Sequence, residues 1–199
     1  MLPRYSAVPR ALAEADFRTL PLYSCCMFRQ MPARLPPIEL SEADTPAVAR
    51  LFDRSADYFL LQGGTAPTLT DAHELLTDVP SDKDAHDQTV LAWKGDDGRF
   101  AVAAILRDHP QVGTWYLGFI IVEASQRGRG LGRSIYSAIE NWATEKGARE
   151  IRLAVLEANQ SGERFWRSCG FSELRRLGPA TFKTRSHRRI ELSRRIDEG

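Results

Sequence analysis

Cysteine is scarce in this sequence, with three residues among 199. Cys25 and Cys26 are adjacent and Cys169 stands alone, a spacing that fits neither a metal site nor a disulfide framework. We therefore expect no metal cofactor and a reducing, cytoplasmic location.

Long apolar runs are missing as well. No stretch approaches the roughly 18 apolar residues that a membrane-spanning helix requires. Charged residues and prolines interrupt the N-terminal region, which therefore lacks the apolar centre of a signal peptide. Membrane insertion and secretion are not expected.

Neither sign of charge is in excess. The 27 basic and 26 acidic residues leave a formal net charge of +1, whereas a general nucleic-acid-binding protein carries a clear basic excess. Nucleic acid is therefore not an expected partner. Since 43% of the residues are hydrophobic, the chain has enough apolar material for one globular domain with its own core.

Residues 1–37 differ from the rest of the chain because they combine many prolines and arginines with no sustained periodicity. We predict that they form an extension outside a main domain of residues 38–199. Several alternatives stay open for this segment: a short helix at residues 11–17, an extended arm, or a translation start at Met27 or Met31.

From residue 38 the hydrophobic pattern becomes regular and predicts a series of elements. Val48, Leu51 and Phe52 recur at helical intervals, and residues 94–98 have the glycine and aspartate content of a hairpin turn. The predicted order is a short strand, two helices, three strands, a helix, a strand, a helix and two strands. Their approximate ranges are 38–40, 42–58, 71–77, 89–93, 99–107, 114–122, 131–146, 151–156, 161–168, 171–177 and 187–195.

The most distinctive stretch is QRGRGLG at residues 126–132, between the apolar run TWYLGFIIV and a helix predicted to start near Leu131. The first turn of a helix has backbone N–H groups without intrahelical partners and a partial positive charge, so it attracts an anion. Glycines let a phosphate approach the backbone closely, and arginines add positive charge. The residues concerned are the glycines Gly128, Gly130 and Gly132 and the arginines Arg127, Arg129 and Arg133.

Three protein families have such a turn. A nucleotide-binding P-loop requires GxxxxGK[ST], but neither Gly-Lys-Ser nor Gly-Lys-Thr occurs in this chain. A dinucleotide-binding GxGxxG motif requires a glycine where Arg133 stands. The remaining pattern, Arg127-x-x-Gly130-x-Gly132 after a long strand, resembles the pyrophosphate loop of the GCN5-related N-acetyltransferases (GNAT). A plain glycine turn between a strand and a helix is the alternative.

A second segment strengthens the resemblance. Residues 153–171, LAVLEANQSGERFWRSCGF, are similar to the second sequence block of that family, and the matching positions are Asn159, Gly162, Phe165, Trp166, Gly170 and Phe171. The resemblance covers residues 38–195. It implies an α/β (α+β) fold with a central mixed, mostly antiparallel sheet of about seven strands, about four flanking helices, and parallel fourth and fifth strands that splay apart.

The resemblance also implies acetyl-CoA as the co-substrate. Splayed parallel strands leave backbone groups unpaired, and the amides of pantetheine can satisfy them as a surrogate strand. By position, the matching backbone here is that of Ile120 and Val122. Asn159 matches an asparagine near the cofactor arm; a helix N-cap is its other interpretation, and both can hold. The implied pyrophosphate-binding residues are Arg127, Gly128, Arg129, Gly130, Leu131, Gly132 and Arg133.

The sequence departs from the family at two catalytic positions. Trp166 stands where many members have a tyrosine thought to protonate the CoA thiolate, and an indole N–H is not acidic enough for that step. Thr114 stands where some protein-acetylating members have a glutamate base. Tyr116 lies on the same strand face as Thr114. Tyr116 and Trp166 are therefore the catalytic candidates, and a packing role for Tyr116 stays open.

Other reactive side chains near the motifs have simpler interpretations. Glu123, at the end of the long strand, is predicted to be solvated. His109 is predicted to be a loop residue, with a base as the alternative. Cys169 is predicted to pack at the end of the last helix rather than act as a nucleophile, and Phe165 to lie in the core.

The sequence therefore predicts an N-acetyltransferase that transfers an acetyl group from acetyl-CoA to a primary amine by direct attack in a ternary complex. A non-catalytic acyl-CoA-binding or regulatory module is the alternative. We expect the acceptor to be a small molecule rather than a protein, bound near residues 57–74 and 179–187. The acyl-chain length and the oligomeric state, with a homodimer among the alternatives, stay open.

Overall fold

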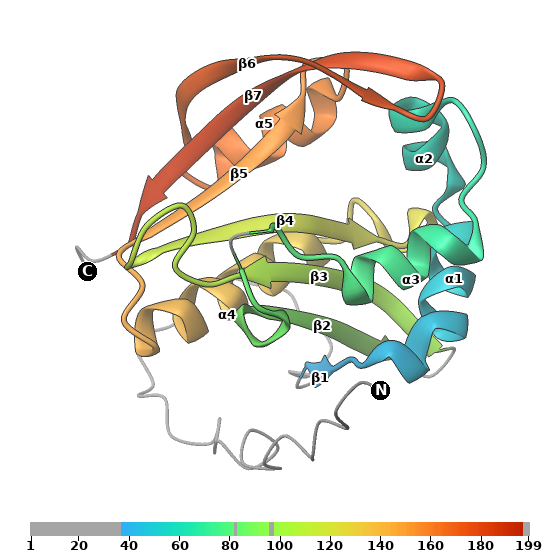
Figure 1. The fold of residues 1–199 in the computed structure, drawn as a ribbon, viewed down its shortest axis with the longest axis horizontal. Helices are drawn as coiled ribbons and strands as arrows, with labels where there is room; N and C mark the ends of the chain where they lie inside the picture. Colours follow the sequence, from blue (N-terminus) through green and yellow to red (C-terminus); the bar gives the residue numbers. More distant parts are fainter. Residues whose placement is uncertain (1–36, 82, 96–97, 197–199) are drawn as a thin grey trace. The chain divides into compact units, whose positions relative to one another are not determined.

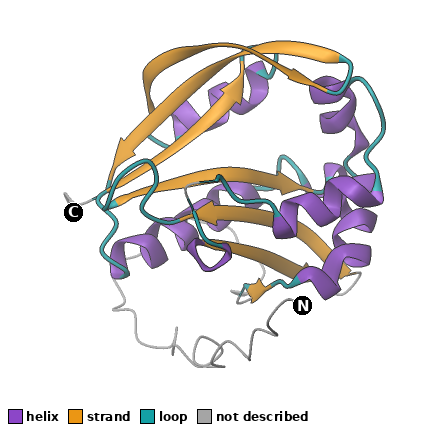
Figure 2. Ribbon diagram, in the orientation of Figure 1, coloured by secondary structure: helices purple, strands orange, loops and turns teal. Residues whose placement is uncertain are grey.

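The computed structural model describes residues 37–81, 83–95 and 98–196 (Figure 1). The predicted extension, residues 1–37, lies outside the described residues except for Pro37, so its nature stays a prediction. The described residues form one sheet with helices on both faces (Figure 2).

The sheet is built from seven strands, which are β1 (Ile38–Glu39), β2 (Gln88–Gly95), β3 (Gly98–Leu106), β4 (Thr114–Val122), β5 (Glu150–Leu156), β6 (Ser172–Phe182) and β7 (Arg185–Arg195). Their order across the sheet is β1-β2-β3-β4-β5-β7-β6. Every neighbouring pair is antiparallel except β4 and β5, which run parallel. The mixed, mostly antiparallel sheet expected from the sequence is confirmed.

The described part of the chain has five α-helices, which are α1 (Thr45–Asp53), α2 (Ala56–Gly63), α3 (Leu69–Thr77), α4 (Leu131–Glu145) and α5 (Gln160–Ser168). Short 3-10 turns occupy Glu42–Asp44, Ala85–Asp87 and Ala124–Gln126. None of the described helices combines the length and the apolar composition that a bilayer crossing requires.

The sequence predicted about four helices, and the additional one arises because the first predicted helix is in fact two. Between α1 and α2 the backbone of Ser55 is not helical, with φ of −130° and ψ of 27°. Phe52 and Phe59 still pack together across this break, with ring centroids 4.6 Å apart. Their apolar spacing continues through the turn, so the periodicity did not reveal it.

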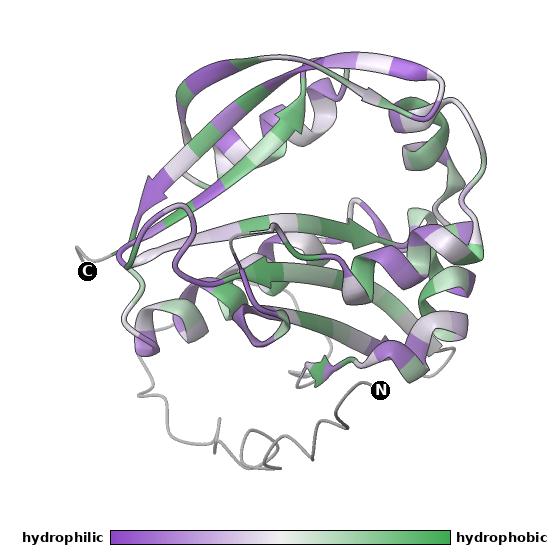
Figure 3. Ribbon diagram, in the orientation of Figure 1, coloured by the Kyte–Doolittle hydropathy of each residue, from purple (hydrophilic) through white to green (hydrophobic). Residues whose placement is uncertain are grey.

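The apolar core lies in two layers, one on each face of the sheet. α4 and α5 cover one face, where Ile135 and Ile139 pack with Trp115. α1, α2 and α3 cover the other face over β2 to β4, where Leu51 and Phe52 are buried. Figure 3 shows that β2, β3 and β4 are mainly hydrophobic, whereas β6 and β7 are mainly hydrophilic. Ile151, Leu153, Ile190 and Leu192 lie in the core under α4 and α5. The alternate residues Glu150, Arg152, Arg189 and Glu191 of β5 and β7 therefore lie on the side of α1 to α3.

The parallel strands β4 and β5 separate along their length (Figure 1). They are paired from Thr114 opposite Glu150 to Tyr116 opposite Arg152, and the pairing ends there. A bulge follows at once in β4, because Leu117 and Phe119 oppose consecutive residues of β3 and Gly118 opposes none. The splay predicted for these two strands is confirmed.

The hairpin of β6 and β7 is longer than predicted, and its tip contacts the end of α2 and the first turn of α3. The backbone N–H of Thr184 donates to the carbonyl of Gly63 over 3.1 Å, and its hydroxyl donates to the same oxygen over 2.8 Å. Lys183 forms an ion pair with Asp71, with 2.6 Å between nitrogen and oxygen. His187 contacts the carbonyl of Gln62 over 3.0 Å. These contacts join two segments that are distant in the sequence.

This junction yields a stability prediction at Gly64, whose φ of +76° is left-handed and whose added Cβ would lie 2.4 Å from Oγ1 of Thr184. We expect Gly64→Ala to lower the free energy of unfolding by about 1–2 kcal/mol or more, because a side chain costs about that much in this conformation. Urea unfolding measures the change. Gly178→Ala is the control, since an added Cβ there meets nothing within 4 Å. Equal stabilities of the two variants would contradict the prediction.

Candidate functional site

The glycine turn lies between the end of β4 and the start of α4. Gly128 and Gly130 have φ of 75° and 81°, a left-handed conformation that favours glycine. Gly130 is the N-cap of α4, and it has no side chain with which to cap the N–H groups of the first turn. A Cβ added at Gly128 would meet nothing within 4 Å. The turn thus offers an open helix N-terminus that fits a pyrophosphate.

The arginines of the turn differ in what they contact. Arg127 donates from Nε to the carbonyl of Val122 over 2.8 Å, and two of its nitrogens donate to the carboxylate of Asp57 in α2. The hydrogen bond from Arg127 holds the pKa of Asp57 below its ordinary value. Arg129 donates to Gln126 within the same turn over 3.2 Å. The first arginine therefore ties the turn to α2.

A second set of contacts fixes the start of α4 against α5. Arg133 donates to the carbonyl of Ser168 over 2.7 Å. A Cβ added at Gly132 would lie 3.3 Å from the ring of Phe165, so a glycine at this position lets the two helices come close. Phe165 packs against the core, in line with the sequence.

Asn159 caps α5. Its side-chain oxygen accepts a hydrogen bond from the N–H of Gly162 over 3.0 Å. A Cβ at Gly162 would lie 2.6 Å from Nδ2 of Asn159, which explains the small residue at that position. The predicted helix cap is present, and contact with the cofactor arm stays a prediction.

Ile120 and Val122 lie in β4 beyond its last pair with β5. They are paired with Ala103 and Ala101 of β3 on one side, and β5 has already separated on the other side. Gly118 is exposed although it lies in the middle of the strand. This stretch of β4 is therefore an open backbone edge beside the glycine turn.

Tyr116 is half-buried at the last pair of β4 and β5, opposite Arg152. Its ring lies edge-on to His109, with centroids 5.8 Å apart. Burial and the negative charge of Glu191 raise the pKa of Tyr116 to about 12, against the opposing charges of nearby arginines. The phenol therefore stays protonated at neutral pH and can donate a hydrogen bond. It is not a base there.

Charged side chains surround Tyr116 on this face of the sheet. Glu150 pairs with Arg152 at 2.9 Å and Glu191 with Arg175 at 2.5 Å. Glu191 is only 4% exposed, an unusual burial for a carboxylate. In the register of β5 and β7, Glu191 lies opposite Ala154 and Arg189 opposite Leu156, so both share the face of Arg152. Sequence reasoning missed these charges, although they occupy alternate positions along β5 and β7.

Trp166 lies elsewhere. It is 6% exposed, and its ring packs edge-on against Tyr136 and Phe171 with centroid distances of 5.6 and 5.3 Å. This aromatic cluster belongs to the core under α4 and α5, on the face opposite to Tyr116. The structure does not bring the two predicted catalytic residues together.

Two further candidates, Glu123 and Cys169, lie in environments that do not make them reactive. Glu123 accepts hydrogen bonds from Arg54 and Ser125, each over 2.8 Å. Burial works to raise the pKa of Glu123, but these two bonds lower it below its ordinary value. Cys169 is buried, and burial raises the pKa of its thiol. Neither environment activates a base or a nucleophile.

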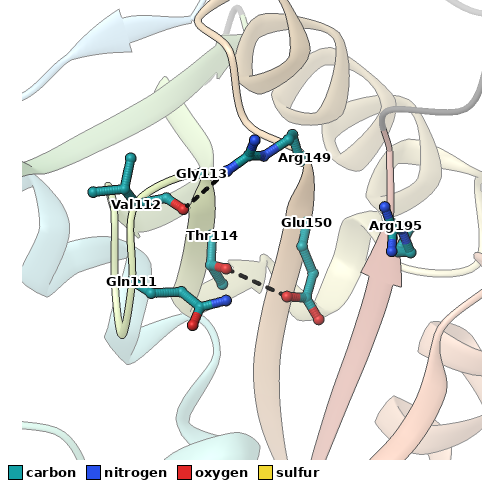
Figure 4. Close-up of a pocket in the computed structure, with 7 residues that line it drawn as sticks. All are labelled: Gln111, Val112, Gly113, Thr114, Arg149, Glu150 and Arg195. Atoms are coloured by element: carbon teal, nitrogen blue, oxygen red, sulfur yellow. Dashed lines mark hydrogen bonds between the residues drawn. The ribbon is translucent and has the colours of Figure 1, made fainter.

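A cavity of about 380 Å³ lies at the paired end of β4 and β5, away from the glycine turn (Figure 4). Its lining residues are Gln111, Val112, Gly113, Thr114, Arg149, Glu150 and Arg195. The hydroxyl of Thr114 donates to Glu150 over 3.3 Å. Because none of the predicted cofactor-binding residues lines it, this cavity is not the candidate site. The candidate site is the open end of the splay, with the glycine turn beside it.

Solved structures with the same fold match over almost their whole length. An acetyltransferase from Thermus thermophilus is 22% identical and superposes with a TM-score of 0.66, covering 80% of this chain and 96% of that one. A ribosomal-protein-alanine N-acetyltransferase from Brucella melitensis is 20% identical, with a TM-score of 0.61 and coverage of 81% and 99%. A GCN5-related N-acetyltransferase from Kribbella flavida is 23% identical, with a TM-score of 0.57 and coverage of 80% and 96%. These likenesses establish the fold.

The family follows from the sequence comparison. No curated protein matches the chain at a significant level. The model of the acetyltransferase (GNAT) family matches residues 50–171, which include β4, the glycine turn, α4, β5 and α5. That range lies inside the predicted main domain. The chain belongs to the acetyltransferase (GNAT) family and is an N-acetyltransferase that uses acetyl-CoA.

Proposed function

We propose that the protein transfers an acetyl group from acetyl-CoA to a primary amine by direct attack in a ternary complex, without a covalent enzyme intermediate. The observation that carries this proposal is the open backbone edge of β4 beside the uncapped N-terminus of α4. The buried Cys169, with its raised pKa, gives no support to a thiol relay.

In this proposal the cofactor lies along β4 and ends at the glycine turn. The backbone of Ile120 and Val122 binds the pantetheine amides, because this edge has no strand partner. The N–H groups of residues 128–133 bind the pyrophosphate. Arg129, whose hydrogen-bond partner Gln126 lies within the turn, adds positive charge, and Asn159 lies near the arm.

Positioning supplies the larger part of the rate. Holding the amine and the thioester in line is worth about 7–11 kcal/mol, whereas a general acid or base contributes about 10²- to 10⁴-fold. An alkyl amine with a pKa near 10.4 must lose a proton before it attacks. Tyr116 is protonated at neutral pH, so we assign it the role of hydrogen-bond donor to the departing thiolate. In this proposal the buried Trp166 contributes only to the aromatic packing of the core. The proposed mechanism uses no metal ion.

The acceptor is proposed to bind on the polar face beyond β4. That face is bounded by the contacts of Gln62 with His187 and of Gly63 with Thr184, which hold α2 against the β6–β7 hairpin. We propose a small-molecule amine as the acceptor and the cytoplasm as the location of the protein.

The alternative function is a non-catalytic acyl-CoA-binding module. It is favoured by one observation, the replacement of the family's tyrosine by the buried Trp166. We expect catalysis: release of free CoA thiol should rise when amino acids, polyamines, aminoglycosides or peptides are added with acetyl-CoA. Binding of acetyl-CoA without amine-dependent CoA release from any of them would favour the module.

Gly130→Val tests the glycine turn. The variant places a β-branched side chain at a left-handed φ of 81° where the phosphate approaches, so we expect acetyl-CoA affinity to fall about tenfold or more while the fold survives. Calorimetry measures the affinity. Gly147→Val is the matched control, because Gly147 ends the same helix with φ of 86° and an added Cβ meets nothing within 4 Å. The same loss of affinity in both variants would refute binding of the pyrophosphate at the glycine turn.

Two phenylalanine substitutions separate the catalytic candidates. Tyr116→Phe removes a protonated hydroxyl beside the splay, and we expect kcat to fall about 100-fold. Trp166→Phe keeps an aromatic ring in the core, and we expect kcat to fall less than about tenfold. Both should retain acetyl-CoA affinity. A larger loss for Trp166→Phe than for Tyr116→Phe, at unchanged melting temperature, would show that the indole N–H takes part instead.

A further inference from the structure

Arg189 lies in β7 on the polar face of the sheet, opposite Leu156 of β5. In β7 the side chains of His187, Arg189 and Glu191 are spaced two residues apart and therefore share one face. His187 contacts Gln62 at the end of α2, and the charge of Glu191 acts on Tyr116. Arg189 thus lies between α2 and the point where β4 and β5 separate.

Arg189 takes no part in the ion pairs of this face. Glu150 is paired with Arg152, and Glu191 is paired with Arg175. Within the described residues, the Arg189 side chain has neither a hydrogen bond nor an ion pair, and its Nε is buried without a partner. Around Tyr116, the arginines Arg152, Arg175 and Arg189 outnumber the glutamates Glu150 and Glu191 by one positive charge.

A sheltered guanidinium nitrogen without an acceptor is costly, because its lost hydration is not replaced. A solvated surface arginine would not show this feature. Arg188, the preceding residue, is exposed and lies on the opposite face of β7. Arg185, near the hairpin tip, donates to the carbonyl of Leu61 over 3.2 Å. Burial without a partner therefore distinguishes Arg189 from its neighbours on the strand.

We propose that Arg189 binds a carboxylate of the acceptor, so that the substrate class is a primary amine that carries a carboxylate, as an amino acid does. The inference rests on the proposed function. A guanidinium presents paired donors that match the two oxygens of a carboxylate. A polyamine, in contrast, would face three arginines.

The test compares matched amines with purified full-length protein and acetyl-CoA. The panel holds several L-amino acids, their amides, and spermidine, and release of CoA is measured for each. We expect kcat/KM for the acids to exceed that for their amides by about tenfold or more, the factor that a charged hydrogen bond supplies. Arg189→Gln should raise KM for the acids by about 10- to 100-fold, with little change in kcat or in the kinetics of the amides.

Two further variants keep the test specific. Arg189→Lys retains the charge and should restore part of the preference for acids. Arg188→Gln removes an equal charge from the opposite face and should change nothing. Acetyl-CoA affinity should be the same in all variants, and none should melt at a lower temperature than the parent protein.

The outcomes separate the inference from the proposed function. Equal turnover of acids and amides, a preference for spermidine, or an equal loss for acids and amides in Arg189→Gln would overturn the inference and leave the function standing. Binding of acetyl-CoA without turnover of any amine would overturn both. Peptides with free and amidated C-termini identify the source of the carboxylate: activity on peptides alone would overturn the assignment to amino acids.

Discussion

The site depends on a single break in hydrogen bonding, since β4 and β5 are paired only as far as Tyr116 and Arg152. Beyond that point each strand keeps its outer neighbour, β3 or β7. The inner edge of β4 is left with backbone groups that need a partner. The bulge at Gly118 follows directly on the last pair and bends the strand there. An extended ligand with amide groups suits this edge.

The two faces of the sheet differ in composition and in the part of the candidate site that each supports. Under α4 and α5 the core is apolar and aromatic, and it holds the start of α4 and the glycine turn in place through Arg133 and the close approach of Gly132 to Phe165. On the other face, α1 and α3 cover the hydrophobic half of the sheet, and α2 contacts the β6–β7 hairpin. The half beyond β4 carries charged pairs around Tyr116.

Ion pairs connect the glycine turn to the helix that bounds the polar face. Arg127 of the glycine turn contacts Asp57 of α2, and Glu123 at the end of β4 contacts Arg54 between α1 and α2. α2 in turn contacts the β6–β7 hairpin at Gly63. Exposed pairs of this kind contribute little stability individually. Their effect is geometric, because they place the helix that bounds the polar face relative to the turn.

The sequence by itself determined what depends on neighbours along the chain. β4 has the predicted bounds, Thr114–Val122, and the strand, glycine turn and helix follow one another as expected, because periodicity and the glycines of the turn are local signals. Only the tertiary structure decided the break at Ser55, where the apolar spacing runs on through the turn. It also decided the partners of Arg127, which is 70 positions from Asp57, and the charges around Tyr116. Alternation along a strand says which residues share a face, but not which strands are neighbours, so contacts between distant segments come from the fold alone.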